Sequence, residues 1–494
     1  MSEPTVQEQA PASRPPRRWL RRAILGAIIL VAVVVGGGLY VNSVWERELR
    51  DAIAEAERSD PGWRLVDLEN KRPVIPDAEN SSVQMARVKQ AQPAKWFIWY
   101  YPPNAPAPGT DLTLDDPERF STSLEEIQPP VRLDAEQERV LRSEMMRGAA
   151  PVAEARKLID YPRGRHPITW RKDVISSLLP ASQDSRNDVS ILRYDVMLLC
   201  QDGDLDGAIR SARASYNASL AVRDEPFAVS QLIHIACRRI SLTDLERILA
   251  QGEPSPDALA DFQRLLEEDD RDNPFLVAMR GERGMLDGFL EVIQHGRLSQ
   301  AELRQALDGL SGNSAGAGLI ESNLELLTLR GTVRRDRADV LRRMNRLVDI
   351  ARLPPEEQRE QIVAWQASVK QEGSPLARKL LSAVEKLSQA CRRSHADVRC
   401  MIVALALERF RRANGRWPGG LQELTRGYLD HVLLDPFDGK PLKYARRDDG
   451  VTVYSVGPDG QDNGGNVTGR WLEEGTDWGY RLWDADRRHQ PPKK

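Results

Sequence analysis

The sequence has little of the residues that build disulfide, metal and nucleic-acid sites. It contains 4 cysteines and 6 histidines in 494 residues, and aromatic residues make up 6%. No CxxC pair and no cysteine–histidine cluster with zinc spacing occurs, which excludes a disulfide scaffold and a structural zinc site. The 70 basic and 73 acidic side chains leave a formal charge of −3. A nucleic-acid-binding protein would carry a clear basic excess, so no nucleic-acid partner is expected.

Motifs of the common enzyme classes are also missing. There is no G-x-S-x-G elbow, H-E-x-x-H motif, P-loop or G-x-G-x-x-G loop. His234 lies between two isoleucines of a helical pattern and is interpreted as a structural residue. His166 lies in a turn and is kept as a candidate site residue. An envelope hydrolase with a carboxylate-based site in a groove between helices, which could use His166, is the alternative hypothesis to an interaction protein.

One apolar segment predicts a membrane anchor. Ala23 to Val41 reads AILGAIILVAVVVGGGLYV, an uncharged run long enough as a helix to cross a hydrocarbon layer of about 30 Å. The arginine-rich residues 1–22 precede it, so the positive-inside rule predicts a cytoplasmic N-terminus and an extracytoplasmic bulk. We therefore expect a single-pass signal-anchor in a bacterial inner membrane. A cleaved signal peptide is the alternative, although the run is long and no A-x-A site follows it.

Residues 42–130 are expected to form a stalk helix and an irregular segment. The stalk should end at Asp60-Pro61-Gly62. Eight prolines lie between Pro93 and Pro130, and such a density favours extended or turn structure. The aromatic run from Trp96 to Tyr101 has two interpretations, a position at the bilayer interface or a wall packed on the helical domain.

Apolar residues recur at three- and four-residue spacing from about Leu133 to Arg393, which predicts an all-helical domain. In the segment 227–240 one face is expected to pack against another helix. That face carries Val229, Leu232, Ile233, Ala236 and Ile240.

The run LLCQDGDLDGAIRSARASY resembles one helix hairpin of the tetratricopeptide type over about 35 residues. No clean 34-residue period accompanies it, so we expect a degenerate helical repeat or an irregular bundle. The turn also matches the opening of a calcium-binding EF-hand at Asp202, Asp204 and Asp206. Position 12 of that loop would be Arg213, a cation where a bidentate glutamate is needed. We therefore expect a helix-hairpin turn capped by aspartate.

Two other features have competing interpretations. Cys200 and Cys237 could meet across neighbouring helices, whereas Cys391 and Cys400 could pair only if their helix broke near Ser394. The segment RGERG, residues 280–284, is expected to interrupt a helix. An internal ion pair is its structural interpretation, and a groove for an anionic ligand is the alternative.

The C-terminal part reads as a helix, a loop, a hairpin and a Gly/Asp loop. Leu442 to Arg446 and Val451 to Val456 are the expected strands, joined by a turn at residues 448–450. This part resembles the soluble domain of type II secretion pseudopilins over about 80 residues. The matched segments are ALALERF (404–410), NGRWP (414–418), LDPFDGKPLKY (434–444) and YSVGPDG (454–460).

The resemblance implies a calcium loop. In calcium-binding members the loop after Y-S-x-G-x-D-G wraps the ion with this aspartate, backbone carbonyls and a later acid, which places Asp459 and the carbonyl of Val456 in the site. Asp462 or Asp477 would be the later acid. A turn that binds no ion is the alternative.

The sequence departs from the pseudopilins in the position of its apolar helix. That helix lies far upstream, and Val31 occupies the place five residues after Gly26 where pseudopilins have glutamate. Processing by a prepilin peptidase is therefore not expected. The whole layout also resembles membrane-anchored proteins of planctomycete-type bacteria, a resemblance that implies no activity.

The expected fold class is mainly α, with a transmembrane helix, an extracytoplasmic helical-repeat-like or bundle domain and a small α+β pseudopilin-like module. The expected function is that of an envelope scaffold that binds a protein or peptide partner. The expected boundaries are a basic tail at 1–22, a transmembrane helix at 23–41, a stalk and irregular segment at 42–130, a helical domain at 131–393, the module at 394–480 and a polar tail at 481–494.

Overall fold

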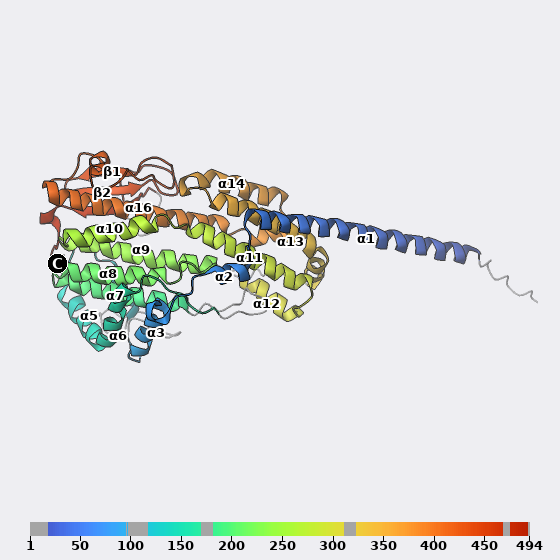
Figure 1. The fold of residues 1–494 in the computed structure, drawn as a ribbon, viewed down its shortest axis with the longest axis horizontal. Coiled ribbons are helices and arrows are strands. Elements are labelled where there is room, and N and C mark those ends of the chain that lie inside the picture. The colour runs from blue at the N-terminus through green and yellow to red at the C-terminus, as the bar shows by residue number, and fades with distance from the viewer. Residues whose placement is uncertain are drawn as a thin grey trace, which may run out of the picture.

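The computed structural model describes residues 18–94, 96, 117–168, 181–310, 323–467 and 475–492. These residues form a mainly helical body with one small antiparallel sheet near the C-terminus, which confirms the expected mainly-α class (Figure 1). The α-helices are α1 Arg18–Ser59, α2 Leu65–Lys71, α3 Ser81–Ala91, α4 Pro117–Glu125, α5 Ala135–Arg147, α6 Ala149–Arg156, α7 Ala181–Gln201, α8 Leu205–Leu220, α9 Ala228–Gln251, α10 Pro256–Asp269, α11 Pro274–Gln294, α12 Gln300–Leu310, α13 Asn323–Ala351, α14 Pro355–Glu372, α15 Pro375–Leu380 and α16 Val384–Asn414. The strands are β1 Lys443–Arg447, β2 Gly450–Ser455 and β3 Trp478–Trp483, and the short 3-10 helices are η1 Asp77–Glu79, η3 Lys157–Asp160, η4 Leu421–Thr425 and η5 Ala485–Arg487.

Helix α1 contains the apolar segment and is long and apolar enough to cross a membrane. Its large apolar side chains from Ile24 to Val41 are exposed, and the helix projects from the body (Figure 1). Because apolar surface of this extent is unfavourable in water, it requires another apolar environment.

The second half of α1 is not a free stalk. Leu49, Ala52 and Ala56 are buried, and the helix packs along α13 in the same direction. The α13 side chain of Arg334 donates to the Asn42 side chain at 2.9 Å, and ten residues later along α1 the carbonyl of Ala52 accepts from Asn345 at 3.2 Å. The segment 42–59 therefore belongs to the helical body, because α13 covers its apolar face.

Trp96 is the described member of the aromatic run, and the rest of the run lies outside the described residues. Its ring is 2% exposed, and its indole nitrogen donates to the carbonyl of Glu144 at 3.0 Å. Trp96 therefore packs on the helical body, as the second interpretation of this run expected.

The predicted buried face of α9 is wrong in most of its positions. Val229 and Leu232 are 51% and 41% exposed, and only Ile233 of the stripe is buried. The inward face of α9 instead carries polar residues, because neighbouring helices supply partners for them. These include Arg238, which bonds to Asp269 of α10 and to Ser394 of α16.

The RGERG segment does not interrupt its helix, contrary to expectation. α11 runs without a break from Pro274 to Gln294. A Cβ atom on Gly281 would lie 1.7 Å from the carbonyl oxygen of Pro226, and one on Gly284 would lie 2.7 Å from the backbone nitrogen of Leu65. The two glycines therefore let other backbone segments approach the helix closely.

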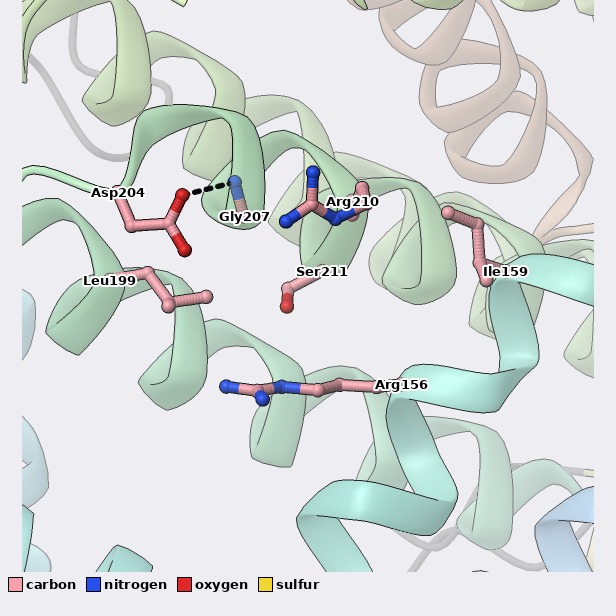
Figure 2. A pocket seen from close by; sticks show the side chains of 7 residues that line it. All are labelled: Arg156, Ile159, Leu199, Asp204, Gly207, Arg210 and Ser211. Atoms are coloured by element: carbon pink, nitrogen blue, oxygen red, sulfur yellow. Dashed lines mark hydrogen bonds between the residues drawn. The ribbon is translucent and has the colours of Figure 1, made fainter.

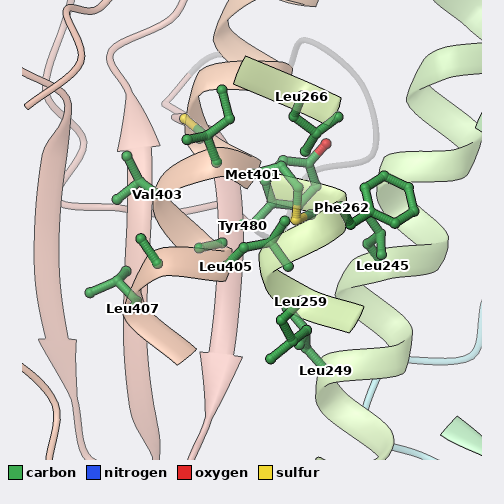
Figure 3. Close-up of a cluster of buried hydrophobic side chains, with 14 of the residues drawn as sticks. Leu245, Leu249, Leu259, Phe262, Leu266, Met401, Val403, Leu405, Leu407 and Tyr480 are labelled. Carbon is green, nitrogen blue, oxygen red and sulfur yellow. The ribbon is translucent and has the colours of Figure 1, made fainter. Parts of the chain in front are cut away.

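The C-terminal sheet has the order β1-β2-β3, with both pairs antiparallel. The two predicted strands match β1 and β2 to within about one residue, whereas β3 was not predicted. The sheet packs on α16 and α9, and one core cluster joins it to α10 (Figure 3). The predicted boundary between residues 393 and 394 falls inside α16, which is a single continuous helix.

The residues predicted as a polar tail include part of the core. β3 ends at Trp483, and Arg488 is 6% exposed. Arg488 donates to both carboxylate oxygens of Glu408 on α16, at 3.0 and 2.8 Å. The sequence alone did not indicate this pair, because its two members are 80 residues apart.

Candidate functional site

A groove lies between two helix pairs of the body. It has two neighbouring hollows, of about 340 Å³ and about 180 Å³, that share Arg156 and Leu199. We call it the α5–α8 groove because α5, α6, α7 and α8 supply nearly all of its lining. The α7–α8 wall is the helix hairpin that the sequence predicted.

A fixed ion pair separates the two hollows. The Arg156 guanidinium donates to both oxygens of Asp195, at 2.7 and 2.6 Å, and Ser211 donates to the same carboxylate at 2.6 Å. Figure 2 shows Arg156 from α6 lying below Ser211 from α8. Hydrogen bonding to Asp195 raises the pKa of Arg156. Asp195 is 4% exposed, so these bonds fix the position of the guanidinium on the floor of the groove.

An apolar strip follows the α5–α6 wall. Met146 is 73% exposed, and Ala149 and Ala153 are also exposed on the same wall. Leu198 and Leu199 line the facing side. Methionine is flexible and polarizable, and exposed methionines are common on surfaces that bind peptides of varied sequence. The strip can therefore accept an apolar side chain.

Arginines lie at both ends of the strip. Arg142 is held by Glu138 at 2.9 Å and by Asp202, which together raise its pKa. Arg210 lines the smaller hollow, is exposed and has no hydrogen-bond or ion-pair partner among the described residues (Figure 2). Arg210 is therefore the one described cation of the groove that can bind an anionic group without losing an existing partner.

The loop that resembled an EF-hand is a capped turn, as expected. Asp204 accepts from the backbone nitrogen of Gly207 at 2.8 Å and caps α8. Asp206 accepts from the backbone nitrogen of Ser255 at 2.7 Å, and Asp202 pairs with Arg142. The three carboxylates have separate partners, so they do not surround a common centre.

The four predicted calcium ligands lie in or beside the loop after β2. Asp477 is 4% exposed and accepts from the backbone nitrogens of Asn463 and Gly465, at 3.1 and 2.7 Å. Asp462 accepts from Tyr454 and the Gly464 nitrogen, both at 3.0 Å.

The other two ligands make different contacts. Asp459 is exposed and accepts from the Gln461 nitrogen at 3.0 Å. Val456 is buried, and its backbone nitrogen donates to Asp435. Over the described residues the structure contains no group of three acidic, histidine or cysteine side chains placed to hold a metal.

Asp435 connects two of the segments that carry the pseudopilin resemblance. Its carboxylate accepts from Ser455 at 2.7 Å and from the nitrogens of Val456 and Phe437, at 2.8 and 2.9 Å. The LDPFDG and YSVGPDG segments are therefore in direct contact. Their aspartate and serine have a structural role in closing the loop onto the end of β2.

His234 and His166, the two histidines considered from the sequence, are both buried. His234 is buried, its Nδ1 lies 2.8 Å from the carbonyl of Ser219, and burial lowers its pKa to about 4. Burial also lowers the pKa of His166 to about 4. Neither residue lines the α5–α8 groove. Both are neutral at pH 7 because their pKa values are well below it.

The buried carboxylates with raised pKa values also lie away from the groove. Burial raises the pKa of Asp244, Glu246 and Glu225 to about 7 in each case, and none of the three lines either hollow. A carboxylate-based hydrolase would need such groups exposed to substrate. The described groove is lined by apolar side chains, paired ions and the exposed Arg210 instead.

The charges of the RGERG segment form an ion-pair centre with a residue from outside it. Arg280 donates to Asp60 at 2.8 and 2.6 Å, and Arg283 bonds to the same carboxylate. Glu282 instead accepts from the backbone nitrogen of Ala228 at 3.0 Å. The expectation of an ion pair within the segment is therefore wrong, because the carboxylate that pairs with its two arginines is Asp60, directly after α1.

The four cysteines are free and buried. Cys200 and Cys237 do not pair, and Cys391 and Cys400 lie on the unbroken helix α16. Burial raises the pKa of Cys200, Cys237 and Cys391 to about 12. The thiols are therefore unreactive near neutral pH.

Sequence reasoning identified the hairpin but missed the residues that make the groove. Arg156, Asp195 and Met146 carry no motif, and each is an ordinary helix residue by spacing. A weak signal was present in MMRGAAPVA, where the exposed Met146 and neighbouring alanines lie beside a helix break at Gly148. The contact between Arg156 and Asp195 exists only because α6 packs on α7 in the folded chain.

Comparison with known proteins gives no match to a family model, a curated protein or a solved structure. The function is therefore argued from the groove and from α1.

Proposed function

We propose that this chain is a membrane-anchored interaction protein of the bacterial envelope that binds a protein or peptide partner in the α5–α8 groove. The exposed apolar half of α1 supports a single-pass anchor in the inner membrane. The arginines ahead of it favour a cytoplasmic N-terminus and a body on the extracytoplasmic side.

The observation that carries the binding role is the apolar strip between fixed arginines. An exposed methionine beside alanines provides apolar contact area, while Arg142 and Arg156 already have carboxylate partners. Arg210 adds a cation that has no partner in the described part of the chain. The groove therefore favours a peptide segment in which an apolar side chain is close to a carboxylate.

The first prediction tests the strip. We expect Met146→Glu to weaken capture of the partner at least about tenfold, because a charge would be desolvated against an apolar side chain. Crosslinking from a photoreactive amino acid at position 149 in intact membranes, followed by mass spectrometry, would identify the partner and measure its capture.

The matched control for Met146→Glu is Val363→Glu. Val363 is a 57% exposed apolar residue on α14, outside the groove, so the charge change is identical. Arg210→Gln should also weaken capture, whereas Met146→Leu should retain it. Equal capture by Met146→Glu and Val363→Glu would contradict the proposed binding site.

We further propose that the C-terminal loop binds calcium through Asp459, Asp462, Asp477 and the carbonyl of Val456. Asp477 accepts one backbone hydrogen bond on each oxygen, from Asn463 and Gly465, so each of these oxygens retains a lone pair for a cation. Asp462 would have to contribute its Oδ2, which faces Lys443 at 3.5 Å, because its Oδ1 already accepts two hydrogen bonds. Burial raises the pKa of Asp477, and repulsion from the Asp462 carboxylate raises it further.

The second prediction concerns this metal. Calcium at 100 times its dissociation constant should raise the free energy of unfolding by about 2.7 kcal/mol, because it binds only the folded loop. Thermal unfolding of the full chain in detergent, with calcium or with chelator, is the measurement. The full chain is needed because the sheet shares its core with α9 and α10.

Asp459→Asn should remove the calcium effect, whereas Asp448→Asn, in the turn between β1 and β2, should leave it unchanged. Equal melting temperatures in calcium and in chelator would leave this loop a turn without an ion.

A further inference from the structure

The end of the body from which α1 leaves carries basic side chains at a defined depth. The apolar run ends at Val41, so Asn42 lies at the boundary between the hydrocarbon layer and the headgroups if α1 spans the membrane. Arg334 donates to the side chain of Asn42 at 2.9 Å. Arg334 of α13 therefore lies at the same depth as Asn42.

The turn between α11 and α12 lies close to this depth. Arg337, one helical turn after Arg334, donates to Gln294 at the end of α11, at 3.1 Å. His295 and Arg297 follow directly and are exposed. We call His295, Arg297, Arg334 and Arg335 the membrane-side rim.

Among the described residues, the rim has more free cations than anions. Arg297 has no ion-pair partner among the described residues, and Arg334 bonds to an amide rather than to a carboxylate. Arg335 is 44% exposed, and its contact to the Asp336 carboxylate is 3.4 Å long. The nearby acids are already engaged: Glu291 faces Arg337 at 3.4 Å, and Glu302 accepts from the Ser299 nitrogen at 2.8 Å.

No linker separates the apolar part of α1 from the part that packs in the body. The helix is continuous from Arg18 to Ser59, and Leu49 is already buried in the body. The glycines at 36–38 lie inside the apolar run. A bend at these glycines would leave the contact between Asn42 and Arg334 intact, and with it the depth of the rim.

We infer that the membrane-side rim contacts the headgroup phosphates of the bilayer that α1 spans. Arginine guanidinium groups bind phosphate oxygens through several hydrogen bonds, and anionic lipids attract basic residues held near the surface. The inference rests on the proposed membrane anchor. It implies that the sheet, which Figure 1 shows at the opposite end of the body, is held away from the membrane.

The test uses the full chain in nanodiscs and single fluorescent labels. The four native thiols are buried, so an introduced cysteine can be labelled selectively. The positions are His295→Cys at the rim, Asp448→Cys at the β1–β2 turn and Val33→Cys in α1. We expect a nitroxide on the lipid headgroups to quench the label at 295 and not the label at 448, and a nitroxide on the acyl chains to quench the label at 33.

A second measurement tests whether the charges of the rim are needed for this contact. It compares two double variants with the same change in net charge. Arg297→Glu with Arg335→Glu should lower quenching at position 295 by about twofold or more in anionic nanodiscs. Arg139→Glu with Arg264→Glu, both 68% exposed in the parent and away from the rim, should leave it unchanged. Unchanged quenching in both double variants would overturn the contact with phosphate.

The two proposals fail in distinguishable ways. A quenched label at 33 with an unquenched label at 295 would contradict the rim contact and retain the anchor. Unquenched labels at both 33 and 295 would contradict the anchor itself, and with it the proposed location of the protein.

Discussion

Replacing Asp60 with alanine should lower the free energy of unfolding by about 3–5 kcal/mol, because it leaves two arginines without their shared carboxylate. Asp60 directly follows α1 and is 6% exposed. It bonds to Arg280 and to Arg283, whose side chain is fully buried and also lies 5.4 Å from the Trp63 ring. This centre joins the end of α1 to α11, so its loss should weaken that junction, while the packing of α1 on α13 remains.

The effect of Asp60 should depend on pH. Burial alone would raise its pKa, but the hydrogen bonds and charges of Arg280 and Arg283 lower it below the ordinary value. A lowered carboxyl pKa gives stabilisation that is complete above the unfolded value of about 4 and is lost as the pH falls through the folded value. The stability difference between the parent and Asp60→Asn should therefore shrink below about pH 4.

The matched control for this centre is Glu57→Ala. Glu57 pairs with Arg64 at 3.4 Å on the surface, where an ion pair contributes under about 1 kcal/mol. Denaturant unfolding of the full chain in detergent, followed by circular dichroism, compares the variants. Equal losses for Asp60→Ala and Glu57→Ala would show that the buried centre contributes no more than a surface pair.

Arg488→Ala should lower the free energy of unfolding by about 3 kcal/mol, because it leaves the fully buried carboxylate of Glu408 with Arg411 as its remaining cationic partner. Hydrogen bonds from Arg411 and Arg488 outweigh burial and lower the pKa of Glu408. Removal of residues 485–494 should have at least the same effect. Thermal unfolding of the full-length and shortened chains measures it.

A double-mutant cycle separates this pair from general loss of packing. Glu408→Gln with Arg488→Met removes both charges and should cost less than Arg488→Met alone, because no buried carboxylate is left short of a partner and Arg411 still pairs with Glu253. Arg487→Ala is the matched control, since Arg487 is 61% exposed beside Asp486. Additive losses in the cycle would contradict a coupled ion pair.

The positions of helices and strands could be predicted from the sequence where a local pattern determines them. Gly415 ends α16 in a left-handed conformation, and the turn at Asp448 and Asp449 joins β1 to β2, because both depend on neighbouring residues. β3 was missed because the residues before it carry no turn pattern that indicates its partner. Its register opposite β2, with Tyr480 facing Val453, depends on a strand more than twenty residues earlier.

The α9 stripe shows why burial could not be predicted in the same way. An apolar face at helical spacing predicts burial when the neighbours are apolar, but Arg238 meets Asp269 and Ser394 in the interior. The α5–α8 groove could not be predicted for the same reason. Asp195 and Arg156 are 39 residues apart, and no spacing along the chain places them in contact.

The sequence by itself determined the apolar helix, the mainly helical class, the hairpin at Asp204 and the two strands after Leu442, because each rests on short-range periodicity or turn chemistry. Only the tertiary structure decided which charges are buried, that residues 42–59 pack on α13 and that Arg488 belongs to the core. The physical reason is that a buried ion is stable only beside its partner. That partner is set by the packing of helices distant in sequence, which no local pattern encodes.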